Sequence, residues 1–173
     1  MNYPVRILEY NPEWKMQFKQ EKAHIGNVLG DNAISIEHIG STSVEGLMAK
    51  PIIDIAVAVR DLNDADSFVE PLMTIGYEYV PKVDFIRRRF FRKGEWRKGT
   101  HHLHVYEITS NEWRNNLLFR DYLRSSPVLL NQYAELKKQL AKYHSNNRNE
   151  YTKSKAPFIQ RVIEMARKEN VET

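Results

Sequence analysis

A chain of 173 residues, of which 42% are hydrophobic and 28% charged, is long enough for one globular domain with a hydrophobic core. The absence of cysteine excludes disulfides, thiolate zinc sites and a cysteine nucleophile. No run of about 18 apolar residues occurs and the N-terminal segment lacks the apolar core of a signal peptide, so we expect a cytoplasmic protein without a membrane partner. The net charge of +4 is small and concentrated in residues 87–98, RRRFFRKGEWRK, which favours a phosphorylated small molecule over nucleic acid as the partner.

The first two thirds of the chain predict a mixture of helices and strands. Apolar residues at Trp14, Phe18, Ile25 and Leu29 predict a helix that begins near Pro12 and ends at Gly30. The near-continuous apolar run IIDIAVAV predicts a central strand buried on both faces. The expected strands cover residues 34–39, 52–59, 77–80, 85–91 and 101–108, with a helix at 61–75 ended by Gly76 and a turn around Gly94.

The last third of the chain changes character. From residue 111 onward it contains no glycine, and Pro127 together with the polar segment at 145–150 divides it into about three helices. The pattern predicts an α+β fold in a single domain over residues 1–173: a mixed α/β core of about residues 1–110 and a helical C-terminal part of about 111–173.

One carboxylate interrupts the buried strand. Asp54 would cost several kcal/mol if it stayed ionised there without a partner, so it either pairs within the fold or serves a site. The order of strand, Gly40-Ser41 loop and acid-bearing strand resembles the nucleotidyltransferase superfamily, which implies a mixed β-sheet flanked by helices. In that superfamily the Gly-Ser pair holds a triphosphate, and an Asp-x-Asp on the next strand holds two magnesium ions. Here Ala56 stands on the face of Asp54 where the second acid would be, so we expect no standard two-metal site.

Longer motifs sharpen the resemblance. EHIGSTSVEGLMAKPIIDI, residues 37–55, resembles the GrpB family pattern EHIGSTSVPGLxAKPxID, with Glu45 in place of proline. The blocks THHLHV at 100–105 and LLFRDYLRSSP at 117–127 match the same family, as do the patterns that begin at Tyr133 and Tyr151. The resemblance spans nearly the whole chain and implies a nucleotidyltransferase-like fold. It implies no common reaction, although some members are fused to a dephospho-CoA kinase domain.

Histidines supply candidate metal ligands. His102 and His104 share one face of their strand, and such a pair has a spacing used for metal ligation. If that strand lies beside the strand of Asp54, the three side chains converge, with His38 as a further candidate. We therefore expect Asp54 to be the catalytic residue and these groups to hold a divalent metal, Mg²⁺ or Mn²⁺ ahead of Zn²⁺. The alternative is that the histidines are hydrogen-bonded core groups or phosphate contacts.

Other candidates would contact the ligand itself. Glycine allows close approach of the backbone to phosphate, and hydroxyl, ammonium and guanidinium groups bind phosphate oxygens. The candidate phosphate-binding residues are Gly40, Ser41, Ser43, Lys50 and Arg89. Alternatively, Arg89 belongs to a solvated basic edge strand that discourages aggregation. Lys50 would alternatively lie at a strand end that faces solvent. The family resemblance suggests further substrate contacts from Arg120, Tyr151 and Lys155 in the helical part.

Three functions fit these residues. The first is a nucleotidyltransferase-like protein that binds a nucleotide or another phosphorylated ligand with a divalent metal and transfers a nucleotidyl group to a small acceptor. The second is a non-catalytic module that binds a nucleotide or a CoA-related molecule, which Ala56 favours. The third is a metal-dependent phosphohydrolase built on the Asp/His cluster. The sequence leaves the choice between enzyme and binding module open, together with the oligomeric state.

Overall fold

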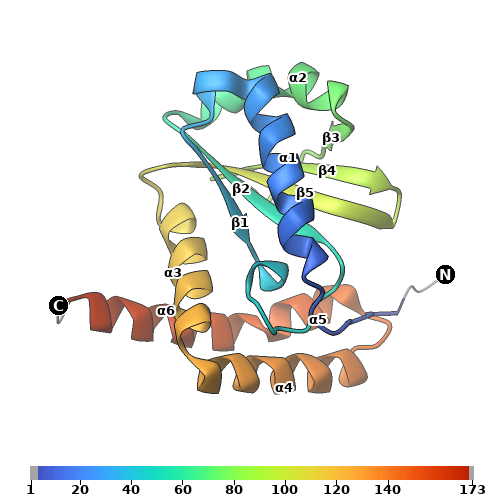
Figure 1. The fold of residues 1–173 in the computed structure, drawn as a ribbon, viewed down its shortest axis with the longest axis vertical. Helices are drawn as coiled ribbons and strands as arrows, with labels where there is room; N and C mark the ends of the chain where they lie inside the picture. The colour runs from blue at the N-terminus through green and yellow to red at the C-terminus, as the bar shows by residue number, and fades with distance from the viewer. Residues whose placement is uncertain (1–3, 172–173) are drawn as a thin grey trace.

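The computed structural model describes residues 4–171, which form a five-stranded mixed sheet with helices against both faces (Figure 1). The strands lie in the order β1-β2-β5-β4-β3. Their bounds are β1 (Ser35–Ile39), β2 (Ile53–Val59), β3 (Tyr77–Tyr79), β4 (Arg89–Glu95) and β5 (Lys98–Glu107). The neighbours β2 and β5 are parallel, whereas the other neighbouring pairs are antiparallel. The predicted α+β class is confirmed.

The helices form two groups in the sequence. The first group contains α1 (Glu13–Leu29), α2 (Val69–Thr74) and the short 3₁₀ helices η1 (Gly30–Asn32), η2 (Ser41–Ser43) and η3 (Leu62–Phe68). The second contains α3 (Asn111–Ser125), α4 (Pro127–Tyr143), α5 (Arg148–Ser154) and α6 (Ala156–Val171). The described part of the last third thus has four helices where about three were expected. The extra helix is α5, which begins where the Asn147 side chain accepts a hydrogen bond from the backbone N–H of Glu150.

Three local expectations need adjustment. The helix expected at 61–75 is present over residues 62–74, but its first part, up to Phe68, is 3₁₀ helix and only Val69–Thr74 is α-helical. The strand expected at 85–91 begins only at Arg89, because the preceding loop folds on itself: the Arg88 guanidinium stacks 3.5 Å above the Phe85 ring. Gly94 lies inside β4 at a shift in register, and the chain turns two residues later, at Trp96 and Arg97.

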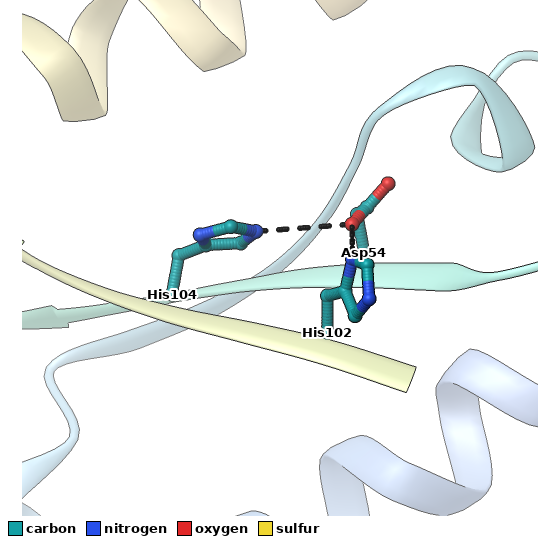
Figure 2. Close-up of side chains that lie close together, drawn as sticks. All are labelled: Asp54, His102 and His104. Atoms are coloured by element: carbon teal, nitrogen blue, oxygen red, sulfur yellow. Dashed lines mark ion pairs between the residues drawn. The ribbon is translucent and has the colours of Figure 1, made fainter. Parts of the chain in front are cut away.

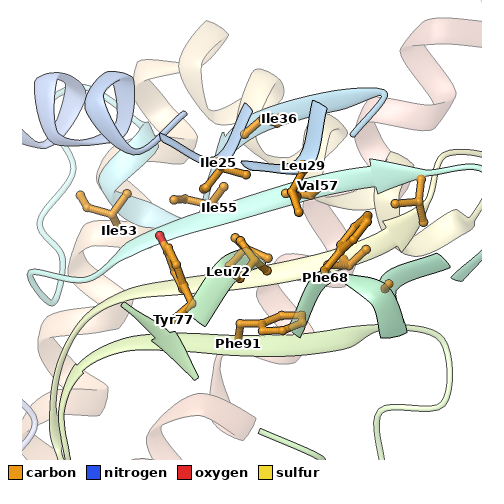
Figure 3. Packing of buried hydrophobic residues seen from close by; sticks show 14 of the residues in the cluster. Ile25, Leu29, Ile36, Ile53, Ile55, Val57, Phe68, Leu72, Tyr77 and Phe91 are labelled. Carbon is orange, nitrogen blue, oxygen red and sulfur yellow. The ribbon is translucent and has the colours of Figure 1, made fainter. Parts of the chain in front are cut away.

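Alternate residues of β2 and β5 face opposite sides of the sheet. One side, here called the α1 face, presents Ile53, Ile55 and Val57 from β2 with Leu103 and Val105 from β5. These side chains pack against α1, η3 and α2 in a core of aliphatic and aromatic side chains (Figure 3). Each fully buried large aliphatic side chain contributes roughly 1.5–3 kcal/mol, so this layer is the main source of the fold's stability.

The other side of the same two strands, here called the cleft face, is less uniformly apolar. It presents Asp54, Ala56 and Ala58 from β2, and His102, His104 and Tyr106 from β5. Trp113 of α3 packs against the two alanines and Tyr106. The helices α3, α4 and α6 also pack on Val44 and Leu47, which follow η2 in the chain. The C-terminal helices therefore cover only part of the cleft face and leave a cleft beside Asp54.

None of the helices that the structure describes is long and apolar enough to cross a membrane.

Candidate functional site

An aspartate and two histidines meet on the cleft face. The parallel register pairs Asp54 with His102 and Ala56 with His104, so the three functional side chains point to the same side. Asp54 Oδ1 lies 3.3 Å from His102 Nδ1 and 3.7 Å from His104 Nε2 (Figure 2). One ligand atom from each residue lies within 4.8 Å of the other two. The convergence predicted for Asp54, His102 and His104 is confirmed.

The protonation states of this cluster suit a cation. Burial tends to raise the pKa of Asp54, but hydrogen bonds and positive charge from His102 and His104 outweigh burial and hold that pKa well below its usual range. Burial lowers the pKa of His104, against the opposing field of Asp54. At neutral pH the cluster therefore offers an ionised carboxylate and a neutral His104 imidazole, which are the forms that bind metal ions.

The loop between β1 and β2 lies directly against the carboxylate. Gly40 has a φ of 72°, and a Cβ at this position would lie 2.6 Å from Asp54 Oδ2, so no other residue fits without displacing the acid. Ser41 follows and lines the cleft. Ser43 does not: it is buried and its hydroxyl donates to the Gly40 carbonyl. The structure therefore gives Ser43 a role in shaping the loop instead of the predicted phosphate contact.

Two arginines of α3 contact β1 and the loop that follows it. Arg120 Nη1 donates to Glu37 Oε2 at 2.7 Å and to the His38 carbonyl at 3.1 Å. Arg124 donates to the Ser43 carbonyl through Nε at 3.0 Å and Nη2 at 2.7 Å. Arg120 lines neither of the two cavities beside Asp54. Its predicted contact with substrate is therefore corrected to a contact with β1.

His38 and Arg89, two further candidates for metal and phosphate binding, lie on the α1 face. The His38 ring stacks on Phe18 with centroids 4.7 Å apart, and its Nε2 is 2.9 Å from Thr42 Oγ1. Burial lowers the pKa of His38 to about 4, so it is a neutral core residue. Arg89 Nε lies 3.4 Å from Asp66 Oδ1. Strand alternation turns both side chains away from Asp54, which corrects the expectation that His38 ligates a metal and Arg89 binds phosphate there.

Two cavities adjoin at Asp54. The first, here called the basic cavity, has a volume of about 570 Å³, and the second, here called the wide cavity, about 820 Å³. Ser41, Asp54, His104 and Lys155 line both. The basic cavity is also lined by Lys50, Lys82, Lys137, Tyr151 and Lys153. The wide cavity has apolar walls from Ile39, Phe119 and Ile159, with the amides Asn115 and Asn116. Both volumes lie in the range of small-molecule sites.

The structure brings Lys50, Tyr151 and Lys155 together in the basic cavity and adds two residues that were not among the sequence-based candidates. Lys137 of α4 is 2% exposed and lines the basic cavity, although it lies within a stripe of core residues. Arg88 lines both cavities in place of Arg89. The signal for Lys137 was present in the family-like segment that begins at Tyr133, since the Leu-Lys pair of that pattern ends at this residue.

Comparison with known proteins gives consistent matches. A family model described as GrpB protein matches residues 4–165. The UPF0157 protein YqkA of Bacillus subtilis is 40% identical over 164 residues, which cover 95% of this chain and 48% of that protein. The chain thus spans about half the length of this relative. The crystal structure of the conserved protein GrpB from Enterococcus faecalis superposes with a TM-score of 0.87 at 38% identity, covering 95% of this chain and 99% of that one.

More distant matches point to two kinds of protein. A cytoplasmic RNA terminal U-transferase structure aligns with a TM-score of 0.51 at 17% identity, over 81% of this chain and 41% of that chain. This likeness shows a shared nucleotidyltransferase-like fold and nothing further. A dephospho-CoA kinase of Mycolicibacterium paratuberculosis is 27% identical over 182 residues, covering 90% of this chain and 44% of that protein.

Proposed function

The chain belongs to the GrpB family, and on that premise we propose that it binds a nucleotide or another phosphorylated ligand, together with a divalent cation, in the cleft beside Asp54. One observation carries the proposal: the Asp54, His102 and His104 cluster lies where the basic cavity and the wide cavity adjoin. A phosphate in the basic cavity would lie beside the cluster, and an apolar group such as a base would reach the wide cavity.

The donor set fits a transition-metal ion better than magnesium. Two imidazoles suit Zn²⁺ or a similar ion and the carboxylate also suits Mn²⁺, whereas Mg²⁺ prefers oxygen ligands in a near-octahedral arrangement. Asp54, His102 and His104 would hold the ion and leave the remaining positions to the ligand. A bound cation supplies neutralisation of charge on phosphate oxygens.

The chain's own groups would position a phosphorylated ligand. Gly40 allows the backbone to approach phosphate, and the Ser41 hydroxyl lies at the boundary of the two cavities. Lys155 lines both cavities and would neutralise charge on either side of the reacting phosphorus. In nucleotidyl transfer, an acceptor hydroxyl attacks the α-phosphorus, the bond to the bridging oxygen breaks, pyrophosphate leaves, and the hydroxyl proton passes to water.

A specific observation favours a second function, a binding module without turnover. Ala56 lies beside His104 on the cleft face, where the second carboxylate of a two-metal site would be. A site with one carboxylate on β2 holds less negative charge and attracts one ion more readily than two. Binding without product would identify this second function.

Thermal unfolding with ligand panels tests the proposal. ATP, GTP, CTP, UTP and dephospho-CoA are each added with Mg²⁺, Mn²⁺ or Zn²⁺ to the wild type and to Asp54→Asn. A ligand at 100 times its Kd stabilises by about 2.7 kcal/mol, which raises the Tm by several degrees in a domain of this size. We expect a metal-dependent shift in the wild type that Asp54→Asn lacks.

A matched control variant is Asp66→Asn, which removes an exposed acid on the α1 face. It should keep the shift seen in the wild type. A shift that survives in Asp54→Asn would disprove the assigned role of Asp54. Chromatography of the nucleotide that gave the shift then separates the functions: pyrophosphate together with a nucleotidyl group on an added acceptor indicates transfer, pyrophosphate or orthophosphate released without an acceptor indicates a phosphohydrolase, and unchanged nucleotide indicates a binding module.

A further inference from the structure

Three lysines line the basic cavity, and two of them lie over the ring of one tyrosine. Lys50 Nζ lies 4.7 Å from the centroid of the Tyr151 ring, and Lys155 Nζ lies 4.6 Å from the same centroid. Lys137 reaches the cavity from α4 and donates to the Met48 carbonyl. These three lysines and Tyr151 are here called the lysine cage. They come from the segment before β2, from α4, and from α5 and the residue after it, so only the folded chain assembles them.

The positive charge of the lysine cage is not compensated by the protein. None of its three ammonium groups lies within ion-pairing distance of a carboxylate in the described part of the chain. Lys82, Arg88 and Lys153 add further cations to the same wall. Asp54, the acid whose field reaches all three lysines, is already paired with two histidines. Buried charge without a partner is costly, so the cage is poised for an anion.

Burial and the crowding of positive charges lower the pKa values of Lys50 and Lys137. Burial, followed by the positive charges of Lys155 and Lys50, lowers the pKa of Lys137 to about 7. Burial, followed by Lys155 and Arg148, lowers the pKa of Lys50 to about 8. A bound anion would raise the pKa of both lysines again, because an opposite charge nearby favours the protonated ammonium.

A second, independent observation points to a ligand. The Tyr151 side chain is fully buried, lines the basic cavity and has a hydroxyl without a hydrogen-bond partner among the described residues. Burial raises the pKa of Tyr151 to about 12, so the group is a neutral phenol that can donate. Buried polar groups in native proteins are nearly always satisfied, and an anion in the cage would accept this bond.

We propose that the lysine cage is a subsite for a polyphosphate chain, such as the terminal phosphates of a nucleoside triphosphate. Three ammonium groups, with further cations beside them, exceed the charge of one phosphate but match two or three linked phosphoryl groups. The inference deepens the proposed function, because it selects a triphosphate as the ligand class over dephospho-CoA, which carries no terminal polyphosphate. With the polyphosphate chain in the lysine cage, the phosphorus atom nearest to Asp54 would be at one end of that chain.

Calorimetry with inorganic phosphates tests the inference directly. Tripolyphosphate, pyrophosphate and orthophosphate are titrated into the full chain at one pH and ionic strength, with a chelator present so that no metal contributes. We expect tripolyphosphate to bind at least tenfold more tightly than orthophosphate. Lys137→Met should weaken tripolyphosphate binding at least tenfold, and Tyr151→Phe several-fold. The control is Lys138→Met, an exposed neighbour on the same helix, which should bind as the wild type does.

Two further readouts separate binding from folding. Lys50→Met removes a cation without a carboxylate partner, so the free protein should be at least as stable as the wild type while tripolyphosphate binding falls. A merely structural Lys50 would lower the Tm instead. Equal affinity for the three phosphates, or equal losses in Lys137→Met and Lys138→Met, would overturn the inference.

Asp54→Asn distinguishes this inference from the proposed function. The variant keeps the lysine cage, so tripolyphosphate should bind at least as tightly as in the wild type, whereas metal-dependent nucleotide binding should disappear. Tripolyphosphate binding without any nucleotide effect would retain the cage and reject the proposed function. Metal-dependent nucleotide binding without any preference among the three inorganic phosphates would retain the proposed function and reject the lysine cage as a polyphosphate subsite.

Discussion

The two faces of the sheet are built by alternate residues of the same strands, yet they serve different purposes. On β5, Leu103 and Val105 point into the α1 face, where both are fully buried among hydrophobic side chains. His102 and His104, their neighbours in the chain, point into the cleft face beside Asp54. Because side chains alternate along a strand, one segment can supply core residues on one face and site residues on the other.

Buried polar groups also differ between the faces. On the α1 face, Glu21 accepts hydrogen bonds from the Tyr77 hydroxyl at 2.7 Å and Lys93 Nζ at 2.8 Å. Among the described residues, the buried polar atoms without a partner are His104 Nδ1, Tyr151 hydroxyl and Glu112 Oε2 at the cleft, and His101 Nε2 on the α1 face. Three of these four atoms belong to residues that line the two cavities, which is where a ligand would supply partners.

The largest expected effect comes from the α1 face. Leu103→Ala should destabilise the protein by about 2–5 kcal/mol, because it removes buried methyl groups and leaves a cavity in the core. Denaturant unfolding measures the loss. The matched variant His102→Asn, one position away on the opposite face, should change stability by less than about 1 kcal/mol, since the side chain is 33% exposed. Similar losses in both variants would contradict the division of labour between the faces.

A pH profile tests whether His38 belongs to the core. The unfolded chain takes up a proton near pH 6.5, whereas burial lowers the pKa of His38 to about 4 in the folded protein. Between these values the unfolded state binds more protons, so stability should fall as the pH falls from 6.5 to 4, by about 3 kcal/mol at most. Unfolding free energies measured across this range should fall less steeply in His38→Gln. A slope that the variant leaves unchanged would show that His38 is not buried in its neutral form.

The loop beside Asp54 should be sensitive to a single methyl group. Gly40→Ala adds backbone strain and a collision with the Asp54 carboxylate, so we expect a loss of about 1–3 kcal/mol and of metal-dependent ligand binding. The control is Gly46→Ala, where φ is also positive at 83° but no atom lies within 4 Å of the added Cβ. The difference between the two variants isolates the collision. Intact ligand binding in Gly40→Ala would separate the loop from the site.

The smallest expected effect concerns Arg124, the residue of α3 that donates to the Ser43 carbonyl. Arg124→Met removes two hydrogen bonds to the Ser43 carbonyl and should cost about 1 kcal/mol. Because the loop also lines the cleft, ligand affinity measured by calorimetry should fall by a few-fold. The exposed Arg114→Met on the same helix is the control and should alter neither quantity. A full loss of binding would instead indicate that Arg124 contacts the ligand directly.

Several features of the protein follow from its sequence alone. The α+β class, the order of the elements and the faces of Asp54, Ala56, His102 and His104 could be predicted, because helix and strand periods are local properties of the chain. The family-like motifs pointed to Lys50, Tyr151 and Lys155, which the structure places together in the basic cavity.

Only the tertiary structure decided which of these groups meet. The parallel pairing of β2 with β5 and its register join Asp54 to histidines about fifty positions away, and no local pattern specifies such a pairing. The same holds for Lys137, whose position in a core stripe of α4 concealed a charged group facing a cavity. Alternation turned His38 and Arg89 to the α1 face, and the fold of residues 80–88 moved Arg88 into the site. Contacts between residues far apart depend on how whole elements pack, which is why the sequence determined the parts and the fold determined the site.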